Sequence, residues 1–311
     1  MNPLATTSLI LLLGAQAGTA RAELVVVRES EPVRLFAGAA RTFPVVWRNT
    51  GKVAIRADVR MRLLQASSAT TVPVSEWPWK QLQVLPGQTV LEHATLDFPE
   101  VRAETRFIVQ WLGDSSGTGF QPVHGVGAPE KGGASSASTE QTGKMPVPLL
   151  GTTEVLVYPS NLLTQLKSLA GKDQLVGVFD PDNTFKPLLK IVGVEYEDLQ
   201  DSAVADFCGR LAVVGPFTSA TSMPADLAER AAKLARQGAC VVWFLPPPGP
   251  DAKLQPTFYT VVAGTNAVVV GQAQLVANLA DDPRSQLNLL QLCRLALHPE
   301  PARLPESTTQ P

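Results

Sequence analysis

The sequence predicts two folded parts: an all-β sandwich, then a doubly wound α/β domain with a mostly parallel sheet. Between residues 23 and 158, apolar and polar residues alternate in runs separated by turn residues, which is typical of strands with one buried face. From residue 160 to 300, continuous apolar runs alternate with segments of helical spacing, which is typical of parallel strands covered on both faces. A length of 311 residues also suits two domains.

Composition excludes several functional classes. Hydrophobic residues make up 45% of the chain and charged residues 17%, so we expect packed cores rather than disorder. The formal net charge of −2 lacks the clustered basic excess of a nucleic-acid-binding protein. The three histidines, His93, His124 and His298, have no metal-ligand spacing, which disfavours a histidine-based zinc site.

The N-terminus carries a targeting signal. A short apolar run, Leu9 to Leu13, is followed by small residues and by Ala20-Arg21-Ala22, an A-x-A cleavage pattern. These features predict a signal peptide over residues 1–22 and export to the periplasm or the outside of the cell. The alternative is a plain lead-in to the first strand. We expect no transmembrane segment after cleavage, and a disordered tail over residues 301–311.

The first part is expected to be antiparallel. Residues 53–63 alternate strictly, and Phe43, Val45 and Trp47 form a similar apolar face just before them. Asn49-Thr50-Gly51 has the chemistry of a hairpin turn and is expected to join these two strands as a hairpin. Further strands are expected at residues 90–98, 107–111 and 155–158, after a turn at Pro86-Gly87. Residues 113–148 are rich in Gly, Ser, Thr and Pro, which predicts a flexible insertion. The pattern T-G-x-x-P-V occurs twice within it.

The run from Phe43 through Trp47-Arg48-Asn49-Thr50-Gly51, with Leu85-Pro86-Gly87-Gln88 later, resembles bacterial immunoglobulin-like modules. The resemblance covers residues 23–158. Such modules bind, space or present other domains, so it implies a presenting role for this part.

The second part reads as alternating helices and strands. Strands are expected at residues 175–179, 194–199, 211–214, 240–245 and 267–270, and helices at 161–170, 185–192, 224–237 and 283–298. Gly238 is the expected C-cap of the third helix.

This element order resembles the class I glutamine-amidotransferase-like domains, which have a flavodoxin-like layout. The stretches that carry the resemblance are Phe185 to Lys190 with Gly193-Val194, and Arg210 to Pro216. Active members of that family place a nucleophilic cysteine after the third strand. Here that stretch reads Val214-Gly215-Pro216-Phe217-Thr218, and the His298-Pro299-Glu300 spacing lies in the tail of the closing helix. The resemblance therefore implies that the amidotransferase chemistry is lost.

One acidic motif keeps an enzyme hypothesis open. Asp180-Pro181-Asp182-Asn183-Thr184 follows the first apolar strand, and ligands bind at the carboxyl ends of such strands. The D-x-D-x-T spacing resembles the first motif of haloacid-dehalogenase-like phosphohydrolases. That resemblance implies Asp180 as nucleophile, Asp182 as general acid/base and, with Asp281 and Asp282, a Mg²⁺ site.

Capping explains the same residues more simply. Asp182 or Asn183 can cap the helix that follows, and Asp281 or Asp282 can cap the helix that opens at Pro283. In that interpretation the chain has no cofactor and no catalytic residue.

Three further features are weighed against ordinary structural roles. Thr218 and Ser219 open a hydroxyl-rich loop that could receive an anion or simply cap a helix. Trp77-Pro78-Trp79 could form a platform for a sugar ring or pack at a strand edge. Cys208, Cys240 and Cys293 are expected to be buried thiols, with a Cys208–Cys240 disulfide as the alternative.

The sequence as a whole favours a non-catalytic exported protein that binds a partner protein or a carbohydrate-like ligand. The expected ligand-binding residues are Asp180, Asp182, Thr218, Ser219, Trp77 and Trp79. The alternatives are the Mg²⁺-dependent phosphohydrolase and a purely structural envelope component.

Overall fold

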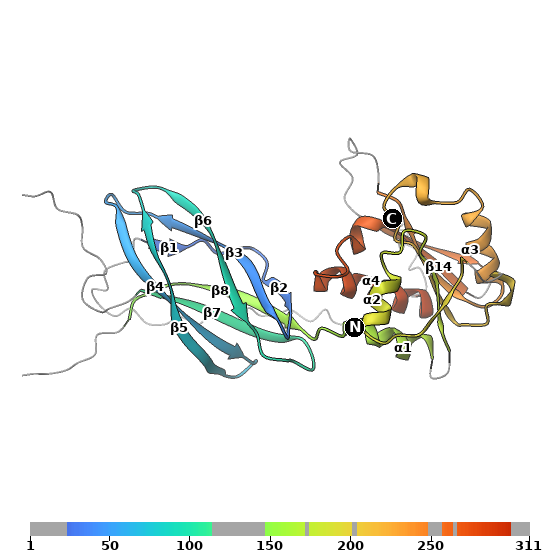
Figure 1. Ribbon diagram of the computed structural model, residues 1–311, viewed down its shortest axis with the longest axis horizontal. Helices are drawn as coiled ribbons and strands as arrows, with labels where there is room; N and C mark the ends of the chain where they lie inside the picture. The colour runs from blue at the N-terminus through green and yellow to red at the C-terminus, as the bar shows by residue number, and fades with distance from the viewer. Residues whose placement is uncertain are drawn as a thin grey trace, which may run out of the picture.

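The computed structural model describes residues 24–113, 147–171, 174–200, 204–247, 257–263 and 266–299. These residues form a β-sandwich and an α/β part that lie end to end along the longest axis of the molecule (Figure 1). The expected signal peptide, most of the glycine- and serine-rich insertion with both copies of its short repeat, and the expected tail lie outside the described residues.

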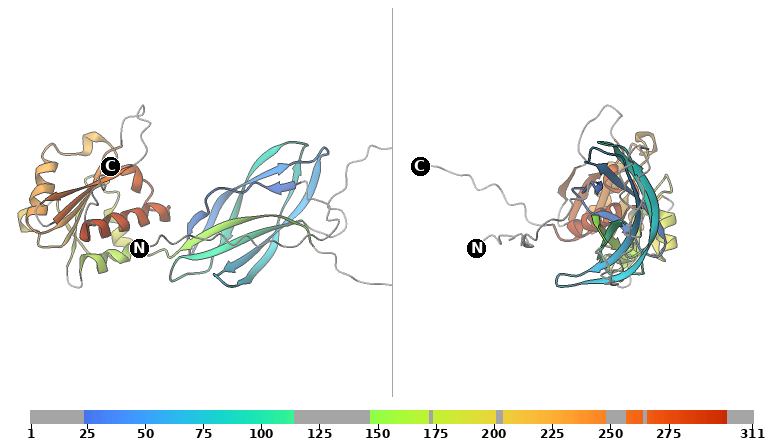
Figure 2. Two further views of the ribbon diagram at one scale, coloured as in Figure 1. Left: turned by 180° about the vertical axis from the view of Figure 1, so that it is seen from behind. Right: turned by 90° about the vertical axis from the view of Figure 1, so that its left-hand side faces the viewer.

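The sandwich consists of two sheets. The smaller sheet has the order β1-β3-β6, and the larger has the order β2-β8-β7-β4-β5. The strand pairs are antiparallel as expected, except that β2 pairs parallel with β8, where the expectation is wrong. The smaller sheet contains β1 (Leu24–Val26), β3 (Ala40–Asn49) and β6 (Thr89–Asp97). The larger contains β2 (Val33–Phe36), β4 (Ile55–Ala66), β5 (Thr71–Val84), β7 (Thr105–Gly113) and β8 (Leu149–Tyr158). The strands of both sheets are strongly twisted, as the two views in Figure 2 show.

Alternation builds the core between the two sheets. On β4 every second residue from Ile55 to Leu63 is buried, and the intervening side chains are not. At one end of this core the rings of Trp47, Trp79 and Trp111 meet, with centroids 5.0 to 5.8 Å apart. Each ring comes from a different strand, so the cluster ties β3 of one sheet to β5 and β7 of the other.

The hairpin predicted at Asn49-Thr50-Gly51 is wrong. β3 and β4 belong to different sheets, so this connection crosses the sandwich instead of turning within one sheet. Asn49 is fully buried, and its side-chain amide donates to the carbonyls of Val53 (2.8 Å) and Val84 (3.0 Å). Its Oδ1 accepts from the Gly51 N–H at 2.8 Å, so the asparagine anchors a crossing loop.

The α/β part has a six-stranded sheet with the order β10-β9-β11-β12-β14-β13. Five strands are parallel, and β13 pairs antiparallel with β14 at one edge. The strands are β9 (Val176–Phe179), β10 (Tyr196–Asp198), β11 (Leu211–Val214), β12 (Cys240–Leu245), β13 (Phe258–Ala263) and β14 (Asn266–Gln272). All four residues of β9 and of β11 are buried, as expected for strands covered on both faces. β13 is a strand that the sequence pattern did not indicate.

Helices pack on both faces of this sheet. One hydrophobic cluster joins the sheet to α1 (Gln165–Ala170), α2 (Lys186–Ile191) and α4 (Pro283–Leu297), and another joins it to α3 (Leu227–Arg236). Four short 3-10 segments complete the part: η1 (Leu162–Thr164), η2 (Val204–Asp206), η3 (Ala220–Ser222) and η4 (Ala273–Val276). Gly238 follows α3 with a φ of 109°, which fits the expected C-cap. Within the described residues, no helix is long and apolar enough to cross a bilayer.

The two parts contact each other through apolar and charged side chains. Phe36 and Tyr158, at the ends of β2 and β8, are buried within the hydrophobic cluster of the α/β part. Arg284 at the start of α4 donates to Glu31 at 2.5 Å. Burial, chiefly, together with a hydrogen bond to Glu104, raises the pKa of Tyr158 to about 12.

All three cysteines are free thiols. The alternative of a Cys208–Cys240 disulfide is therefore wrong, and so is the expectation that all three are buried, because Cys208 is exposed. Burial raises the pKa of the Cys293 thiol to about 12, which makes it an unreactive core residue.

Candidate functional site: the carboxyl edge of the parallel sheet

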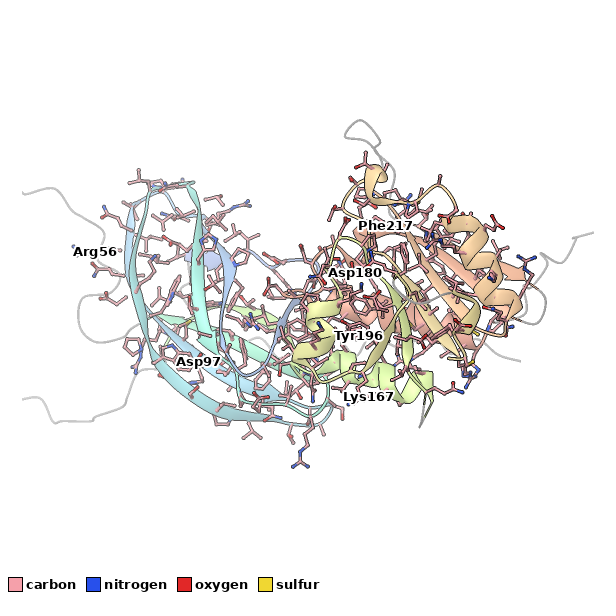
Figure 3. All side chains as sticks on the ribbon, turned by 45° about the vertical axis from the view of Figure 1, so that its right-hand side comes forward. Arg56, Asp97, Lys167, Asp180, Tyr196 and Phe217 are labelled. Atoms are coloured by element: carbon pink, nitrogen blue, oxygen red, sulfur yellow. The ribbon has the colours of Figure 1, made fainter. Side chains whose placement is uncertain are left out.

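The strand order of the sheet reverses at β9, so the connections on its two sides run in opposite directions along the sheet. β9 lies between β10 and β11, so the chain passes from β9 to one neighbour and later to the other. In open α/β sheets, ligands bind in the crevice outside the carboxyl ends of the strands at such a point. The predicted acidic motif follows β9, and the predicted hydroxyl-rich loop follows β11 (Figure 3, near Asp180 and Phe217).

Asp180 is fully buried and all its hydrogen bonds are local. Its Oδ1 accepts from the N–H of Thr184 at 3.1 Å and from the hydroxyl of the same residue at 3.3 Å. Its Oδ2 accepts from the N–H groups of Phe185 (2.7 Å) and Lys186 (2.9 Å). Asn183 reverses the chain with a φ of 52°, which brings these donors back to the carboxylate.

The Asp180 carboxylate therefore occupies the main-chain N–H groups at the start of α2. Three main-chain N–H groups that an external anion could have used are bound to this carboxylate. Asp182 or Asn183 was expected to cap α2. The cap is instead Asp180, which lies two residues before Asp182 in the sequence.

Asp182 bridges the two predicted candidate regions. Its Oδ2 accepts from the N–H of Thr218 at 2.6 Å and from the hydroxyl of Thr218 at 2.7 Å. Burial pushes the pKa of Asp182 upward, but the two bonds from Thr218 and one from Ser222 outweigh it, so the pKa lies below its usual value. The sequence placed these residues in separate motifs, and the structure brings them into contact.

The rest of the hydroxyl-rich loop bonds to itself. The Ser219 hydroxyl lies 2.7 Å from that of Thr221 and 3.1 Å from that of Ser222. Before the loop, Gly215 has a φ of 89°, and a Cβ there would lie 3.1 Å from the Phe217 ring, so this position favours glycine. The peptide bond between Gly215 and Pro216 is cis.

A buried lysine lies beside the acidic motif, and the sequence did not indicate its burial or its partners. Lys186, the first residue of α2, is 6% exposed, and its Nζ donates to Asp198 Oδ2 at 2.5 Å and to Gln200 Oε1. Burial raises the pKa of Asp198, but the bonds from Lys186 and from the Gln200 N–H outweigh it and leave the pKa lowered. The predicted helix contained this lysine, but nothing in the helical pattern indicated an acidic partner on β10.

A half-open cavity of about 420 Å³ lies at the same carboxyl edge. It extends from Thr184 and Leu188 on the β9 side, past Pro216–Thr218, to Pro247 and the segment 273–281 after β14. Its polar side chains are Thr184, Thr218, Gln274, Asn278 and Asp281. No Lys, Arg or His is among the described residues that line it. The Oε1 of Gln274 is buried and has no hydrogen-bond partner within the described residues.

The second pair of acidic residues does not join the first. Asp282 caps α4, because its Oδ1 accepts from the Arg284 N–H at 2.9 Å and its Oδ2 from the Ser285 hydroxyl at 3.2 Å. Asp281 lines the cavity, but its side chain is 84% exposed, and its Oδ1 lies 3.9 Å from Arg41. Within the described ranges, no group of three or more His, Cys, Asp or Glu side chains is placed to hold a metal ion.

The predicted tryptophan platform is part of the sandwich core. Trp79 stacks on Trp47 with an interplanar angle of 23° and contacts Trp111, and Trp77 packs against the same hydrophobic cluster. Both side chains are half-buried. The Nζ of Lys80 lies 5.3 Å from the centroid of the Trp79 ring, where it covers part of the remaining surface.

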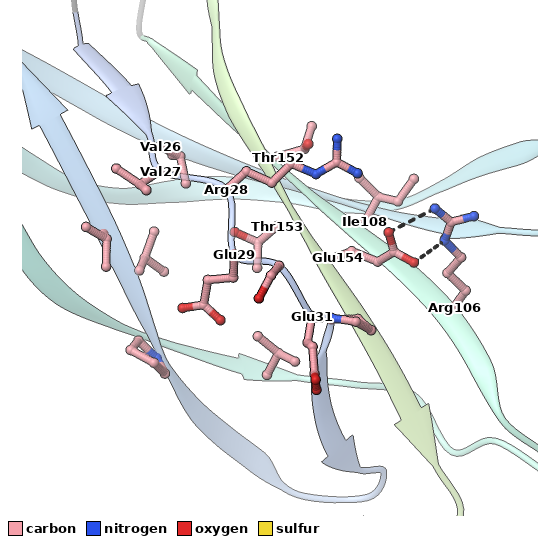
Figure 4. Close-up of a pocket in the computed structure, with 16 residues that line it drawn as sticks. Val26, Val27, Arg28, Glu29, Glu31, Arg106, Ile108, Thr152, Thr153 and Glu154 are labelled. Atoms are coloured by element: carbon pink, nitrogen blue, oxygen red, sulfur yellow. Dashed lines mark hydrogen bonds and ion pairs between the residues drawn. The ribbon is translucent and has the colours of Figure 1, made fainter. Parts of the chain in front are cut away.

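A smaller cavity of about 200 Å³ lies in the sandwich, beneath the segment 27–32 that crosses from β1 to β2 (Figure 4). Among its charged side chains, Arg106 pairs with Glu154 at 2.7 Å, and Glu31 accepts from Arg34 and Arg284. This cavity is smaller than the one at the sheet edge and is therefore the weaker candidate.

Comparison with known proteins gives no family. No protein-family model and no curated protein sequence matches the chain. Among solved structures, it is similar to an alkylpurine DNA glycosylase, AlkC, of Pseudomonas fluorescens, with 10% identity, a TM-score of 0.27, and coverage of 44% of this chain and 31% of that one. A CARDB domain from Pyrococcus furiosus in complex with di-metal ions matches with 12% identity, a TM-score of 0.24, and coverage of 44% and 93%.

A PapD-like domain of human CEP192 matches with 8% identity, a TM-score of 0.24, and coverage of 50% of this chain and 97% of that one. This chain thus spans less than a third of the glycosylase. At these scores, none of the three similarities says what this chain binds or catalyses.

Proposed function

We propose that this chain is a non-catalytic binding protein. The ligand site is the cavity at the carboxyl edge of the parallel sheet, and the ligand is small, uncharged and rich in hydroxyl groups, as a sugar is. The observation that carries the proposal is the chemistry of the lining, which is neutral except for Asp281 and contains no basic residue among the described residues.

The chain's own carboxylates argue against an anionic ligand. The N–H groups at the start of α2 bind Asp180, and the N–H and hydroxyl of Thr218 bind Asp182. Both are places at which main-chain donors could have received a phosphate. With both filled, and no Lys or Arg in the lining, a phosphate would meet the carboxylate of Asp281, whose nearest cation, Arg41, already faces that carboxylate at 3.9 Å.

The remaining polar groups favour a ligand that donates hydrogen bonds. The hydroxyls of Thr184 and Thr218 donate to Asp180 and Asp182, which leaves their lone pairs as acceptors. The side chain of Gln274 is a further polar group in the lining. Apolar surfaces from Leu188, Pro216 and Pro247 lie beside them, which suits the apolar faces of a sugar ring.

At the level of fold, we propose that the α/β part is a flavodoxin-like, glutamine-amidotransferase-like domain without the catalytic cysteine. Numbered along the chain, its parallel strands have the order 2-1-3-4-5, which supports the flavodoxin-like layout. The segment Gly215-Pro216-Phe217 after the third strand, where active members place the cysteine, supports the loss of activity. The sandwich would then be an immunoglobulin-like module of an exported protein, which is supported by its two sheets and by the apolar N-terminal run.

The test is saturation-transfer NMR on the full chain with glucose, galactose, N-acetylglucosamine and maltose, beside inorganic phosphate and glucose 6-phosphate. We expect transfer to at least one neutral sugar and none to phosphate. The Gln274→Met variant, which keeps the side-chain length, should lose most of the signal. The Gln83→Met variant on the exposed face of β5 should keep it.

The same preparation distinguishes the phosphohydrolase alternative. Hydrolysis of a generic phosphomonoester is measured with and without Mg²⁺, beside an Asp180→Asn variant. Mg²⁺-dependent turnover that disappears in the variant would overturn the binding proposal. Failure of every neutral sugar to bind the wild-type chain would also contradict it, and would favour the purely structural role.

A further inference from the structure

Most sheet edges of the described fold are short or carry residues that discourage pairing with another chain. The long edge strand β5 contains Pro73 and Pro78, and β6 contains Glu92, His93 and Asp97. At one edge of the parallel sheet, β10 has only three residues, and two of them are acidic. Short strands, prolines and charges are the features by which proteins protect exposed edges.

The other edge of that sheet, β13, has none of these features. Its six residues, Phe258–Ala263, include no charge and no proline. Phe258 is 49% exposed, Tyr259 is 56% exposed and Val261 is 47% exposed, so large apolar side chains face solvent on both sides of the strand. Within the described residues, no further strand pairs with this edge. An apolar edge strand is a template for pairing with another strand.

The hydrogen bonds to β14 show which main-chain groups of β13 face outward. The Gln272 N–H donates to the Thr257 carbonyl at 3.2 Å, and these two residues are in register in the antiparallel ladder that β13 continues. Antiparallel ladders alternate bonded and non-bonded pairs, so Tyr259 and Val261 bond to β14. The N–H and C=O groups of Phe258, Thr260 and Val262 therefore point away from the sheet.

We propose that β13 pairs antiparallel with β13 of a second copy of this chain, about a two-fold axis at Thr260. Thr260 then exchanges hydrogen bonds with the partner's Thr260, and Phe258 with the partner's Val262. Tyr259 and Val261 face each other across the axis without main-chain bonds. Aromatic–β-branched and threonine–threonine pairs are favourable cross-strand neighbours. The two six-stranded sheets join into one.

A second copy fits this edge better than a peptide of another protein. Recognition of a foreign strand depends on pockets for its side chains, and neither cavity described above is lined by a residue of β13. Self-pairing needs no such pocket, because the strand supplies both halves of each pair. It also closes after two copies, because the opposite edge at β10 is short and acidic.

The experiment is sedimentation velocity on the full chain from about 1 µM to about 500 µM, since an interface of one strand pair is small and weak. We expect a monomer–dimer equilibrium in this range. In the dimer, the amides of Phe258, Thr260 and Val262 should gain protection from hydrogen exchange with rising concentration. The amides of Tyr259 and Val261 should be protected at every concentration.

Three substitutions at or beside the axis make the test specific. Thr260→Pro removes an outward N–H and leaves the bonds to β14 in place, so it should raise the dimer dissociation constant about tenfold or more. Thr260→Ala, which keeps the N–H and removes only the side-chain pair, is the matched control and should change it much less. Val261→Lys places a charge beside the partner's strand and serves if the proline variant fails to fold.

Three outcomes would overturn the proposal. They are a monomer at every concentration, a dimer that neither Thr260→Pro nor Val261→Lys weakens, and exchange protection that appears on another strand. None of them depends on whether the cavity binds a sugar, so this inference stands or fails separately from the proposed function.

Discussion

The carboxylate of Asp182 accepts two hydrogen bonds from Thr218, at 2.6 Å from its N–H and 2.7 Å from its hydroxyl. The two residues lie 36 positions apart in the sequence. They meet because β9 and β11 are neighbours in the sheet and end at the same edge. This contact fixes the loop after β11 beside the cavity and removes a main-chain donor from any anion that might otherwise enter.

Thr218→Val is expected to lower the free energy of unfolding by about 1 kcal/mol, because it deletes one bond to a charged, partly exposed carboxylate. The pKa of Asp182 is lowered in the folded state, so its contribution to stability is present above its ordinary value of 3.8 and is lost as the pH falls through the folded pKa. Urea denaturation at pH 7 and at about pH 3 measures both effects. An equal loss at the two pH values would contradict the role of the charge.

Asp180→Ala is expected to lower the free energy of unfolding by about 2–4 kcal/mol, because it leaves three N–H groups of a buried helix start without an acceptor. Asp281→Ala is the control, since that side chain is 84% exposed and its removal should change stability by less than about 0.5 kcal/mol. Urea unfolding curves compare the two. Similar losses for both variants would rule out the capping role of Asp180.

Lys186→Met is expected to destabilise the chain by about 1–3 kcal/mol, because it leaves the Asp198 carboxylate without its main partner. The double variant Lys186→Met with Asp198→Leu should recover much of the loss, since no partly buried charge then remains unpaired. Thermal unfolding of the two single variants and the double variant forms a cycle. Additive losses in the double variant would show that the two side chains do not interact.

Trp79→Ala is expected to lower stability by about 2–3 kcal/mol, because the ring packs between Trp47 and Trp111 while remaining half-buried. Sugar binding at the sheet edge should not change. Near-ultraviolet circular dichroism should lose part of its tryptophan signal, while Leu91→Ala on the exposed face of β6 should leave it intact. Loss of sugar binding with unchanged stability would instead support a platform for glycans.

Local patterns in the sequence were enough to predict many elements. The apolar run from Cys240 to Leu245 is a strand with those bounds, and the closing helix begins at Pro283 as expected. Both have short-range causes, namely hydrophobic periodicity and a proline at the first helical position with Asp282 as its cap. β13 was missed because the residues from Phe258 to Val261 are all exposed, so this segment shows no alternation of apolar and polar residues.

The candidate site was predicted only in part, for the same reason. The sequence indicated that Asp180, Asp182, Thr218 and Ser219 follow strands, and the structure places them at one edge. It did not indicate that Asp180 turns back to α2, that Lys186 reaches Asp198, or that Gln274 lines a cavity. None of these contacts produces a periodic pattern in the sequence.

The sequence by itself determined which segments become strands and helices, because backbone geometry and the burial of one face act over a few residues. Only the tertiary structure decided that Asn49 starts a crossing between sheets, that the acidic motif is turned inward to bind N–H groups, and that β13 is an edge strand. These outcomes depend on which strands become neighbours. Neighbouring strands are selected by the packing of the whole sheet, and residues far apart in the chain meet only after that selection.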